Sequence, residues 1–583
     1  MAVLVAGTPS LFRPGYSPDE EFTLFAVRGI HAHGLPLLPS ALVYDRGLAY
    51  SYLSWFAGLV TGWELPAYRA ISLLSAVVSL ALVFTIARRL TAPVVVERNF
   101  RSAFSASAAF LATTFVATSL PFWSVATTGR FYATFMAAWL SVAVVFSHLS
   151  HLSHLRTLAL LAALSFLCRL THELAFTLLA IPLLMALMSK PQDFKSSGPL
   201  LLKASAALVA GLVVSQVVLF GLHYAAPASG DTMIRRFFVW QVLNLFERPP
   251  AAQVGVVLSA LVVAWLVVPK RAGLSTVIGL CGTAMVLAFA MARATAAAPV
   301  SFALVAGVLE ASSRYPLDML WHIAHANPVT LGLALVLLVA RLLDAGGEWT
   351  GGERAAHVGW VGWVLWFGVL DSGITINYLL MPVTLMLAAI AIDLVAVAQH
   401  AAALWPGPRA QMIRAGLVMV ALLVVADQWR GTGSVADRLA VARPTIDVPG
   451  VALIRDGLQP DDRVACTDEL ACLVIMGRAD AWLALDDFVR ERFVVTRQGQ
   501  QTGVYTGAPA VFRPNALFTV RPNGHMPARV IVVDVFKGYP IGNSSTWLPR
   551  AIDADGLESR TLLETAQARI VEISVPLRNA RAP

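Results

Sequence analysis

Long apolar runs, separated by short polar breaks, make up most of the chain as far as Asp427. A helix needs about 20 mostly apolar residues to cross the hydrocarbon core of a bilayer. Several runs are shorter, and we expect them to borrow residues from their flanks or to form paired, broken helices. The pattern predicts twelve membrane spans, at residues 67–87, 103–120, 131–148, 157–168, 174–188, 204–222, 254–268, 274–293, 328–343, 357–370, 374–397 and 412–427.

The pattern changes after Asp427. From Gln428 to Pro583 no apolar run is long enough to cross about 30 Å of hydrocarbon, and short alternating runs between Gly- and Pro-rich pieces take their place. This predicts a transmembrane domain over 1–427 and a soluble α/β domain over 428–583. The expected strands are Arg463–Cys466, Phe493–Thr496, Arg529–Val535 and Ala568–Val575.

Composition supports a membrane protein and excludes several other classes. Of the 583 residues, 57% are hydrophobic and 13% are charged, whereas soluble domains carry about 25% charged residues. So few charges cannot cover a soluble surface, which excludes an ordinary cytosolic enzyme, a disordered scaffold and a disulfide-rich secreted domain. The net charge of +8 is small for this length, and the basic residues lie in short loops, so no nucleic-acid partner is expected.

The basic residues predict the orientation of the chain. One set of alternate loops carries twice as many Lys and Arg residues as the opposite set, and its loops are shorter. By the positive-inside rule, the basic set faces the cytoplasm. We therefore expect a multi-pass plasma (inner) membrane protein with its active site, its first outer loop (13–66) and its C-terminal domain on the extracytoplasmic side.

Two features stay open on the sequence alone. Met1–Phe12 is apolar but too short to span, and it lacks the basic start of a signal peptide. Either this start is incomplete and a thirteenth span belongs here, or the segment lies in the membrane interface. Cys466 and Cys472 form either a local disulfide or two buried thiols.

Four clusters of polar residues lie on the expected outer side, where charges beside membrane spans are costly and tend to be functional or paired. They are SPDEEF with Asp19, Glu20 and Glu21; VYDRGLAYSYL with Asp45, Arg46, Tyr50 and Tyr52; GRFYATF with Arg130 and Tyr132; and FLCRLTHELAF with Arg169, His172 and Glu173. Each also has a purely structural interpretation. In the order of the clusters, these interpretations are acidic residues at a helix start, an interfacial helix with a tyrosine belt, an arginine that snorkels to the membrane surface, and an ion pair between residues i and i+4 of a helix.

Familiar catalytic motifs are absent from the sequence. It has no GxxxxGK[ST] loop, no GxGxxG after a strand, no GxSxG elbow and no CxxC. His172–Glu173 lacks the second histidine of a zinc-protease signature, because position 176 is Phe.

Several segments resemble the GT-C class of integral membrane glycosyltransferases, in particular its family 39 and family 83 types, the protein O-mannosyltransferases and the lipid A aminoarabinose transferases. PDEEFTLFAVRGIHAHGLPLLP resembles the first outer loop of the class, and GRFYATF resembles its Ala-Arg-x-Tyr motif. YDRGLAYSYLSWFAGLVTG is similar to the next block, although the usual Pro pair is absent. AYRAISLLSAVVSLALVFTIARRL is similar to the second span, and INYLLMPVTLMLAAIAIDL to a late span, with Asn377 in place of Arg.

The resemblance implies an α-helical GT-C membrane domain that takes a polyprenyl-phosphate sugar as donor and a lipid, glycan or protein as acceptor. It makes Asp19 the catalytic carboxylate, with Glu20 beside it. A carboxylate within hydrogen-bond reach takes the proton of the attacking hydroxyl, and a single base on an in-line attack implies inversion.

The leaving group of such a reaction is a phosphate, whose developing charge is stabilised by fixed cations. The residues that we expect to serve this role are Arg46, Arg69, Arg130, Arg169 and His172. Further substrate contacts are expected from Asp45, Tyr132, Glu173 and Tyr378.

Two alternatives stay open on the sequence. Asp19, Glu20 and Asp45 could hold a divalent cation through oxygen ligands, as in the oligosaccharide-transferring branch of the class, but the family 39 and 83 types lead us to expect neither metal nor cofactor. Charged, broken helices also suit a transporter or flippase, and a lipid-linked glycan ligase is the other rival.

Overall fold

The computed structural model describes residues 2–12, 20–37, 43–91, 98–147, 154–179, 181–182, 191–225, 320–343, 356–364, 379–405, 407–440, 451–459, 462–466, 481–482, 484–485, 492–497, 500–506, 529–535, 558–564 and 568–574. The chain divides into two compact units. The helical unit comprises Met1–Arg13, Ala57–Leu219 and Arg235–Ala440. The sheet unit comprises Pro14–Phe56, Phe220–Ile234 and Val441–Pro583.

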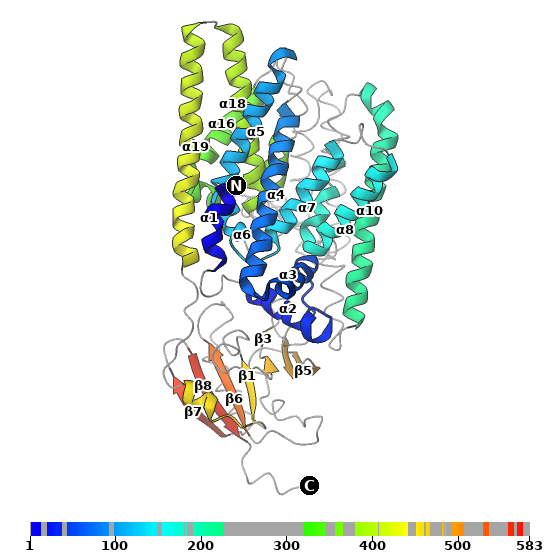
Figure 1. Ribbon diagram of the computed structural model, residues 1–583, viewed down its shortest axis with the longest axis vertical. Helices are drawn as coiled ribbons and strands as arrows, with labels where there is room; N and C mark the ends of the chain where they lie inside the picture. Colours follow the sequence, from blue (N-terminus) through cyan, green and yellow to red (C-terminus); the bar gives the residue numbers. More distant parts are fainter. Residues whose placement is uncertain are drawn as a thin grey trace, which may run out of the picture. The chain divides into compact units, whose positions relative to one another are not determined.

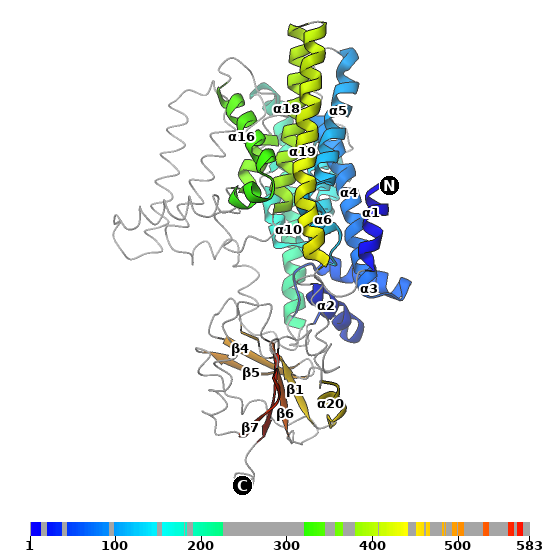
Figure 2. The same ribbon diagram turned by 90° about the vertical axis from the view of Figure 1, so that its left-hand side faces the viewer.

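Most of the long helices of the helical unit run roughly alongside one another (Figure 1). The helices of this unit include α1 (Ala2–Leu11), α4 (Leu65–Thr91), α5 (Arg98–Ala117), α6 (Leu120–Ala126), α7 (Tyr132–Ser147), α8 (His154–Thr171), the 3₁₀ helix η1 (Glu173–Leu179), most of α10 (Pro191–Ala225), α16 (Pro328–Leu343), unlabelled helices at 320–326 and 356–364, α18 (Leu380–Leu404) and α19 (Pro408–Ala440). Figure 2 shows α18 and α19 side by side from a second direction.

The helices confirm a multi-pass membrane protein. Within the described residues, four helices are long and apolar enough to cross a bilayer, at Leu65–Thr91, Pro199–Leu219, Leu380–Ala401 and Pro408–Arg430. A fifth span is formed if Phe104–Ala117 and Leu120–Ala126, bent by 66° at their break, count as one. The start of the predicted span 174–188 is a 3₁₀ helix instead of an α-helix. The predicted spans 254–268 and 274–293 lie outside the described residues.

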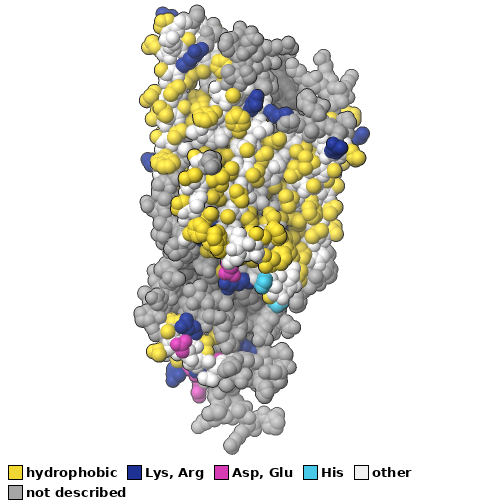
Figure 3. Space-filling model, in the orientation of Figure 1, with side chains coloured by type: hydrophobic (Ala, Val, Ile, Leu, Met, Phe, Trp, Pro, Cys, Tyr) yellow, Lys and Arg dark blue, Asp and Glu magenta, His cyan; other side chains and the backbone are white. Residues whose placement is uncertain are grey.

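Burial separates a central helix from a peripheral one. In the apolar stretch of α18, 83% of the residues are buried, against 17% in α19. Many of the exposed residues of α19 are apolar, including Met419, Leu422 and Leu423. Figure 3 shows hydrophobic side chains over much of the visible face of the helices. An apolar outer surface of this kind is matched to lipid instead of water.

Two buried polar clusters fix helices to one another. Asp427 of α19 accepts hydrogen bonds from the backbone N–H (2.9 Å) and the hydroxyl (2.8 Å) of Thr330, in the first turn of α16. A carboxylate is favoured at this position because the first N–H groups of a helix lack partners within it. His357 Nε2 lies 2.8 Å from Asp393 Oδ2, with both side chains 1% exposed. This pair joins the helix at 356–364 to α18.

A close helix contact joins α8 and α10. Ser165 donates a hydrogen bond to the carbonyl of Leu208 (3.0 Å), across the two helices. At Gly211 an added Cβ would collide with the Ser165 hydroxyl and with the carbonyl oxygen of Ala162. Small residues at such crossings let helix backbones approach one another in a membrane.

We expect Gly211→Ala to lower the melting temperature of the detergent-solubilised protein, because the added methyl group meets backbone of α8. Overpacking of this kind costs about 1–3 kcal/mol. Gly221→Ala in the same helix is the matched control, since a Cβ there meets nothing within 4 Å. Equal melting temperatures for the two variants would contradict the close contact.

In the sheet unit, the helices α2 (Glu20–His33) and α20 (Val451–Asp456), and the start of α3 (Leu48–Thr61), accompany two sheets. One sheet has the strand order β2-β1-β6-β8-β7, parallel across β2, β1 and β6 and antiparallel across β6, β8 and β7. The other is antiparallel, in the order β3-β4-β5. The strands are β1 (Arg463–Cys466), β2 (Ala481–Trp482), β3 (Ala484–Leu485), β4 (Arg492–Arg497), β5 (Gln500–Thr506), β6 (Val530–Val535), β7 (Glu558–Glu564) and β8 (Ala568–Ser574).

These strands confirm the α/β character predicted for the C-terminal region. All four expected strands are present, as β1, β4, β6 and β8. Val464, Ile531, Val533 and Ile570 are buried together between the sheet and Val451 of α20. The side chains of Cys466 and Cys472 lie outside the described residues.

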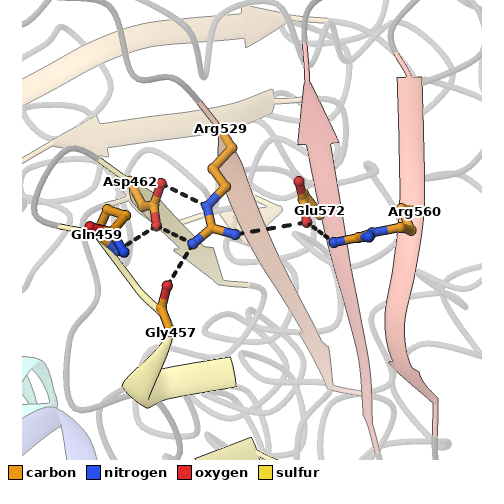
Figure 4. A network of polar contacts seen from close by, with 6 residues as sticks. All are labelled: Gly457, Gln459, Asp462, Arg529, Arg560 and Glu572. Carbon is orange, nitrogen blue, oxygen red and sulfur yellow. Dashed lines mark hydrogen bonds and ion pairs between the residues drawn. The ribbon is translucent and has the colours of Figure 1, made fainter. Parts of the chain in front are cut away.

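A network of charged residues crosses the larger sheet (Figure 4). Arg529 binds Asp462 through two nitrogens, at 2.8 and 2.7 Å, and donates to the carbonyl of Gly457 at 2.7 Å. Glu572 accepts a hydrogen bond from Arg560 at 2.9 Å and lies 3.9 Å from Arg529. The hydrogen bond with Asp462 raises the pKa of Arg529.

Arg529→Met should destabilise the larger sheet by about 2–3 kcal/mol, because it leaves the Asp462 carboxylate, 2% exposed, without its cation. Hydrogen exchange of the β1 and β6 amides in the full-length protein measures the loss. Arg560→Met is the control. It also removes a partner of Glu572, but Arg560 is 73% exposed, and exposed pairs contribute less than about 1 kcal/mol. Equal exchange in the two variants would refute the assignment.

Candidate functional site

Four of the expected site residues lie at one end of the helical unit. Arg69 is in the second turn of α4, and Arg130 lies two residues before the start of α7. Arg169 is in the last turn of α8, and His172 immediately follows that helix. The Ser72 hydroxyl donates to the Arg130 carbonyl (3.0 Å), which fixes this end of α4 beside the start of α7. The opposite end of α4 carries Arg88 and Arg89 in its last turn.

The guanidinium group of Arg130 lies against two aromatic rings. Its Cζ is 4.9 Å from the centroid of the Phe131 ring and 5.5 Å from that of Tyr132. Arg130 is only 3% exposed. It sits in the break between α6 and α7, where its backbone N–H donates to the carbonyl of Thr128 at 2.8 Å. Such cation–π contacts orient a guanidinium group while leaving its charge in place.

The imidazole ring of His172 packs on the same aromatic residues. Its centroid lies 5.0 Å from the Phe131 ring, 5.5 Å from Tyr132 and 5.2 Å from Phe135. His172 is 2% exposed. The residue follows the last turn of α8, so this contact brings the end of α8 to the start of α7. Arg130, Tyr132 and His172 therefore form one cluster, which we call the Arg130 cluster together with Phe131 and Phe135.

Two further arginines are buried near this end of the helices. Arg169 is 4% exposed and donates from Nη2 to Oε1 of Gln216 on α10, at 3.1 Å. Arg69 is fully buried, and its Nη1 lies 3.4 Å from the carbonyl oxygen of Leu11, at the end of α1. A guanidinium group keeps its charge in proteins. This end of the helical unit therefore holds three permanent positive charges that are shielded from water.

Buried cations of this kind favour an anionic ligand. Guanidinium groups make strong, directional hydrogen bonds to phosphate oxygens, and a charge in a low-dielectric site acts more strongly than in water. Among the described residues, no group of three or more His, Cys, Asp or Glu side chains could hold a metal ion. The three buried arginines, Arg69, Arg130 and Arg169, are suited to binding a phosphate.

The other expected site residues belong to the sheet unit or lie outside the described residues. Asp19 and Tyr378 are not among the described residues, and neither is the side chain of Glu173. Glu20 is the first residue of α2 and is fully buried in the sheet unit. Asp45 and Arg46 are partly buried in the same unit, between the isolated bridge Leu37↔Val43 and α3.

Helices α2 and α3 are held together by local contacts. The Tyr52 hydroxyl of α3 donates to the carbonyl of Gly34, which follows α2, at 2.8 Å. Burial raises the pKa of Tyr52, so its hydroxyl keeps the proton that this hydrogen bond needs. Gly29 has no room for a Cβ, because the backbone of Leu37 lies against it. These contacts hold α2, the residues that directly follow it and α3 together.

Sequence reasoning missed three residues that help to build the site: Phe131, Phe135 and Gln216. Gln216 could have been found, because it interrupts an apolar run in the predicted span 204–222. The two phenylalanines could not, since aromatic residues at helical spacing in an apolar segment are ordinary core residues.

Comparison with known proteins defines the class of fold: it is that of the GT-C membrane glycosyltransferases. The crystal structure of ArnT from Cupriavidus metallidurans bound to undecaprenyl phosphate matches with a TM-score of 0.51 and 14% identity, over 98% of this chain and 96% of ArnT. The archaeal oligosaccharyltransferase AglB from Archaeoglobus fulgidus, in complex with an inhibitory peptide and a dolichol-phosphate, gives a TM-score of 0.49 and 13% identity, over 92% of this chain and 69% of AglB.

Sequence comparison alone does not reveal this likeness. No family model matches the chain, and no curated protein matches it in sequence. The match to ArnT, at 14% identity, confirms the predicted fold class. The identities of the site residues rest on the geometry of the Arg130 cluster and its neighbours.

Proposed function

We propose that this protein transfers a glycosyl group from a polyprenyl-phosphate sugar to an acceptor hydroxyl, on the extracytoplasmic face of the plasma membrane. The observation that carries the proposal is the gathering of Arg69, Arg130 and Arg169, all at most 4% exposed, at one end of a GT-C fold. ArnT, which shares this fold, was solved with undecaprenyl phosphate. A lipid phosphate suits such a site, because its chain can lie against the membrane helices while its phosphate binds the buried guanidinium groups.

In the proposed reaction, the Arg130 cluster binds the phosphate that leaves the sugar. As the bond from the anomeric carbon to the phosphate oxygen breaks, negative charge develops on that oxygen. Guanidinium groups already in position stabilise this charge without reorganising, which is the largest effect in many enzymes. Arg169 and Arg69 contribute charge at the same end of the helices, and Arg46 is the further expected contact from the outer loop.

The acceptor hydroxyl must lose its proton as its oxygen attacks the anomeric carbon. We assign this step to Asp19, with Glu20 next to it, because a carboxylate within hydrogen-bond reach can act as the base. The transfer then proceeds with inversion at the anomeric carbon. Asp45, Tyr132, Glu173 and Tyr378 are the proposed contacts to the sugar and the acceptor.

The extracytoplasmic placement rests on the charge distribution. Arg88 and Arg89 close α4 at the end opposite Arg69, and Arg409 and Arg414 lie in the first turns of α19. Basic loop ends of this kind face the cytoplasm, so the Arg130 cluster faces outward. Nucleotide sugars are made in the cytoplasm, which is why an outward-facing transferase requires a lipid-borne donor.

Mass spectrometry of envelope glycans and polyprenyl-phosphate sugars, in cells with and without the gene, tests the proposed function. We expect the deletion strain to accumulate one polyprenyl-phosphate sugar and to lack one glycan residue. A transporter or flippase would instead leave its substrate on the cytoplasmic leaflet. A glycan ligase would cause accumulation of a lipid-linked oligosaccharide. Unchanged donors and glycans would refute the proposal.

We also propose that transfer needs no metal ion, because buried guanidinium groups supply the positive charge that a cation would otherwise provide. Treatment of the purified protein with EDTA is therefore expected to leave the rate of transfer within about twofold of the untreated rate, given that removing a catalytic metal costs several kcal/mol. Loss of turnover that added Mg²⁺ or Mn²⁺ restores would contradict this.

A further inference from the structure

The hydrogen bond of His172 determines which of its ring nitrogens carries a proton. The backbone N–H of Leu174 donates to Nδ1 of His172 at 3.0 Å. A backbone N–H can only donate, so Nδ1 must present its lone pair. In the neutral ring the single proton therefore resides on Nε2, and Nε2 can act only as a donor.

The local fold holds this arrangement in place. His172 immediately follows α8 and donates its backbone N–H to the Cys168 carbonyl at 3.0 Å, and η1 begins at the next residue. The Thr177 hydroxyl donates to the carbonyl of Leu174 at 2.6 Å, and the indole N–H of Trp139 on α7 donates to Thr177 at 3.0 Å. The backbone that fixes Nδ1 is thus itself tied to α7.

The surroundings of the ring restrict its orientation. Phe131, Tyr132 and Phe135 all contact the imidazole, with centroids 5.0–5.5 Å away. The Arg130 guanidinium group lies over two of these rings. A second proton on the imidazole would have to sit on Nδ1. The backbone N–H of Leu174 already donates to this atom, so two hydrogen-bond donors would then face each other. The structure thus disfavours both the cationic form and rotation of the ring.

We infer that His172 acts as a neutral hydrogen-bond donor, through Nε2–H, to a phosphate oxygen of the polyprenyl phosphate that the Arg130 cluster binds. It does not act as the base of the reaction. This inference rests on the proposed function, which supplies the phosphate. The inference adds to the proposed function the protonation state and the role of His172, which the sequence analysis predicts only as a phosphate contact.

A purely structural role makes a different prediction. If His172 served only to cap the N–H of Leu174, asparagine would be the best replacement, since its short side-chain oxygen is a preferred helix cap. If Nε2–H is the group that matters, glutamine is the better replacement, because its amide N–H₂ extends to about the position of Nε2. His172→Gln and His172→Asn are therefore a matched pair.

Binding of undecaprenyl phosphate to the purified full-length protein, followed by native mass spectrometry, separates the two roles. We expect His172→Gln to weaken the dissociation constant by less than about fivefold and His172→Asn by about tenfold or more, the scale of one lost hydrogen bond to a charged group. Equal losses, or a smaller loss in His172→Asn, would overturn the inference.

Nitrogen NMR of protein labelled with ¹⁵N-histidine tests the tautomer without reference to activity. The His172 signals are assigned by their absence from the His172→Gln spectrum. We expect Nε2 to give the shift of a protonated ring nitrogen and Nδ1 that of an unprotonated one. The opposite pattern, or two protonated nitrogens, would overturn the inference even if glycosyl transfer is confirmed. Conversely, the expected pattern in a protein that binds no polyprenyl phosphate would leave the tautomer standing and refute the phosphate contact.

The hydrogen bonds of Thr177 to Leu174 and to Trp139 of α7 provide a second variant, in case substitutions of His172 disturb folding. Thr177→Val removes the hydroxyl that bonds to Leu174 and to Trp139, at nearly constant volume. We expect it to broaden or shift the His172 nitrogen signals and to weaken undecaprenyl phosphate binding. Thr113→Val on α5 is the control, because its hydroxyl donates to the Ala109 carbonyl within its own helix. Unchanged His172 signals in Thr177→Val would contradict the proposed support by η1.

Discussion

Replacing Arg130 by methionine is expected to lower kcat/KM for glycosyl transfer by about 10²–10³-fold, the cost of removing one fixed group that stabilises transition-state charge. Methionine retains much of the apolar contact with Phe131 and Tyr132 but removes the guanidinium group. Arg88→Met is the matched control, because Arg88 lies exposed at the opposite end of α4 and should leave turnover within about twofold, as for an ordinary surface substitution.

Arg130→Lys refines this prediction. Lysine keeps the positive charge but lacks the planar group that stacks on aromatic rings and binds phosphate through two N–H groups. We expect an intermediate loss in kcat/KM, smaller than that of Arg130→Met. Should Arg130→Met leave both kcat and the KM for the lipid donor unchanged, Arg130 would be a snorkelling anchor and the account of the site would be wrong.

Asp19→Asn is the second substitution with a large expected effect. Loss of a general base lowers rates by about 10²–10⁴-fold, and we expect this loss in kcat, with the KM for the lipid donor little changed. Single-turnover transfer from a polyprenyl-phosphate sugar, measured across the two variants Asp19→Asn and Glu20→Gln, identifies the base. The residue whose substitution causes the larger loss of the transfer rate is the base.

The outcome also distinguishes a base from a structural acid. Glu20 begins α2 and is fully buried, so Glu20→Gln is expected to affect stability as well as turnover. Asp19→Asn should show the full loss of kcat while its melting temperature stays near that of the wild type. Wild-type turnover in Asp19→Asn would remove Asp19 from the mechanism.

Hydropathy alone located the membrane helices well, because burial in lipid imposes a strong compositional demand. The predicted spans 67–87, 204–222 and 412–427 lie within α4, α10 and α19. The ends were less accurate, since a helix continues into polar sequence where its hydrogen bonds allow. Thus α19 runs on to Ala440. The break between α5 and α6 has a local cause in Pro121, which cannot donate a backbone hydrogen bond.

Strands were predictable where burial produced an apolar run and not where pairing alone determines them. The sequence of β6, VIVVDV, is apolar because Val530 to Val533 are all buried. The sequence of β7, ESRTLLE, is polar and largely exposed. It becomes a strand through antiparallel pairing with β8, which no local pattern reveals.

The site was predictable in part for a similar reason. Arg130, Arg169 and His172 stand out in the sequence because charged residues at membrane depth are costly and need a reason to persist. Their meeting could not be foreseen, since it depends on how the end of α8 packs on the start of α7. The aromatic rings that join Arg130 to His172, and the Gln216 partner of Arg169, are consequences of that packing.

The central claim is that the buried guanidinium groups at this end of the helical unit bind a lipid phosphate. Titration of undecaprenyl phosphate into the purified wild-type protein, Arg130→Met and Arg88→Met, followed by native mass spectrometry, tests it most directly. We predict saturable binding by the wild type and by Arg88→Met, and binding at least about tenfold weaker by Arg130→Met. Absence of saturable binding, or equal affinities in all three proteins, would contradict the claim.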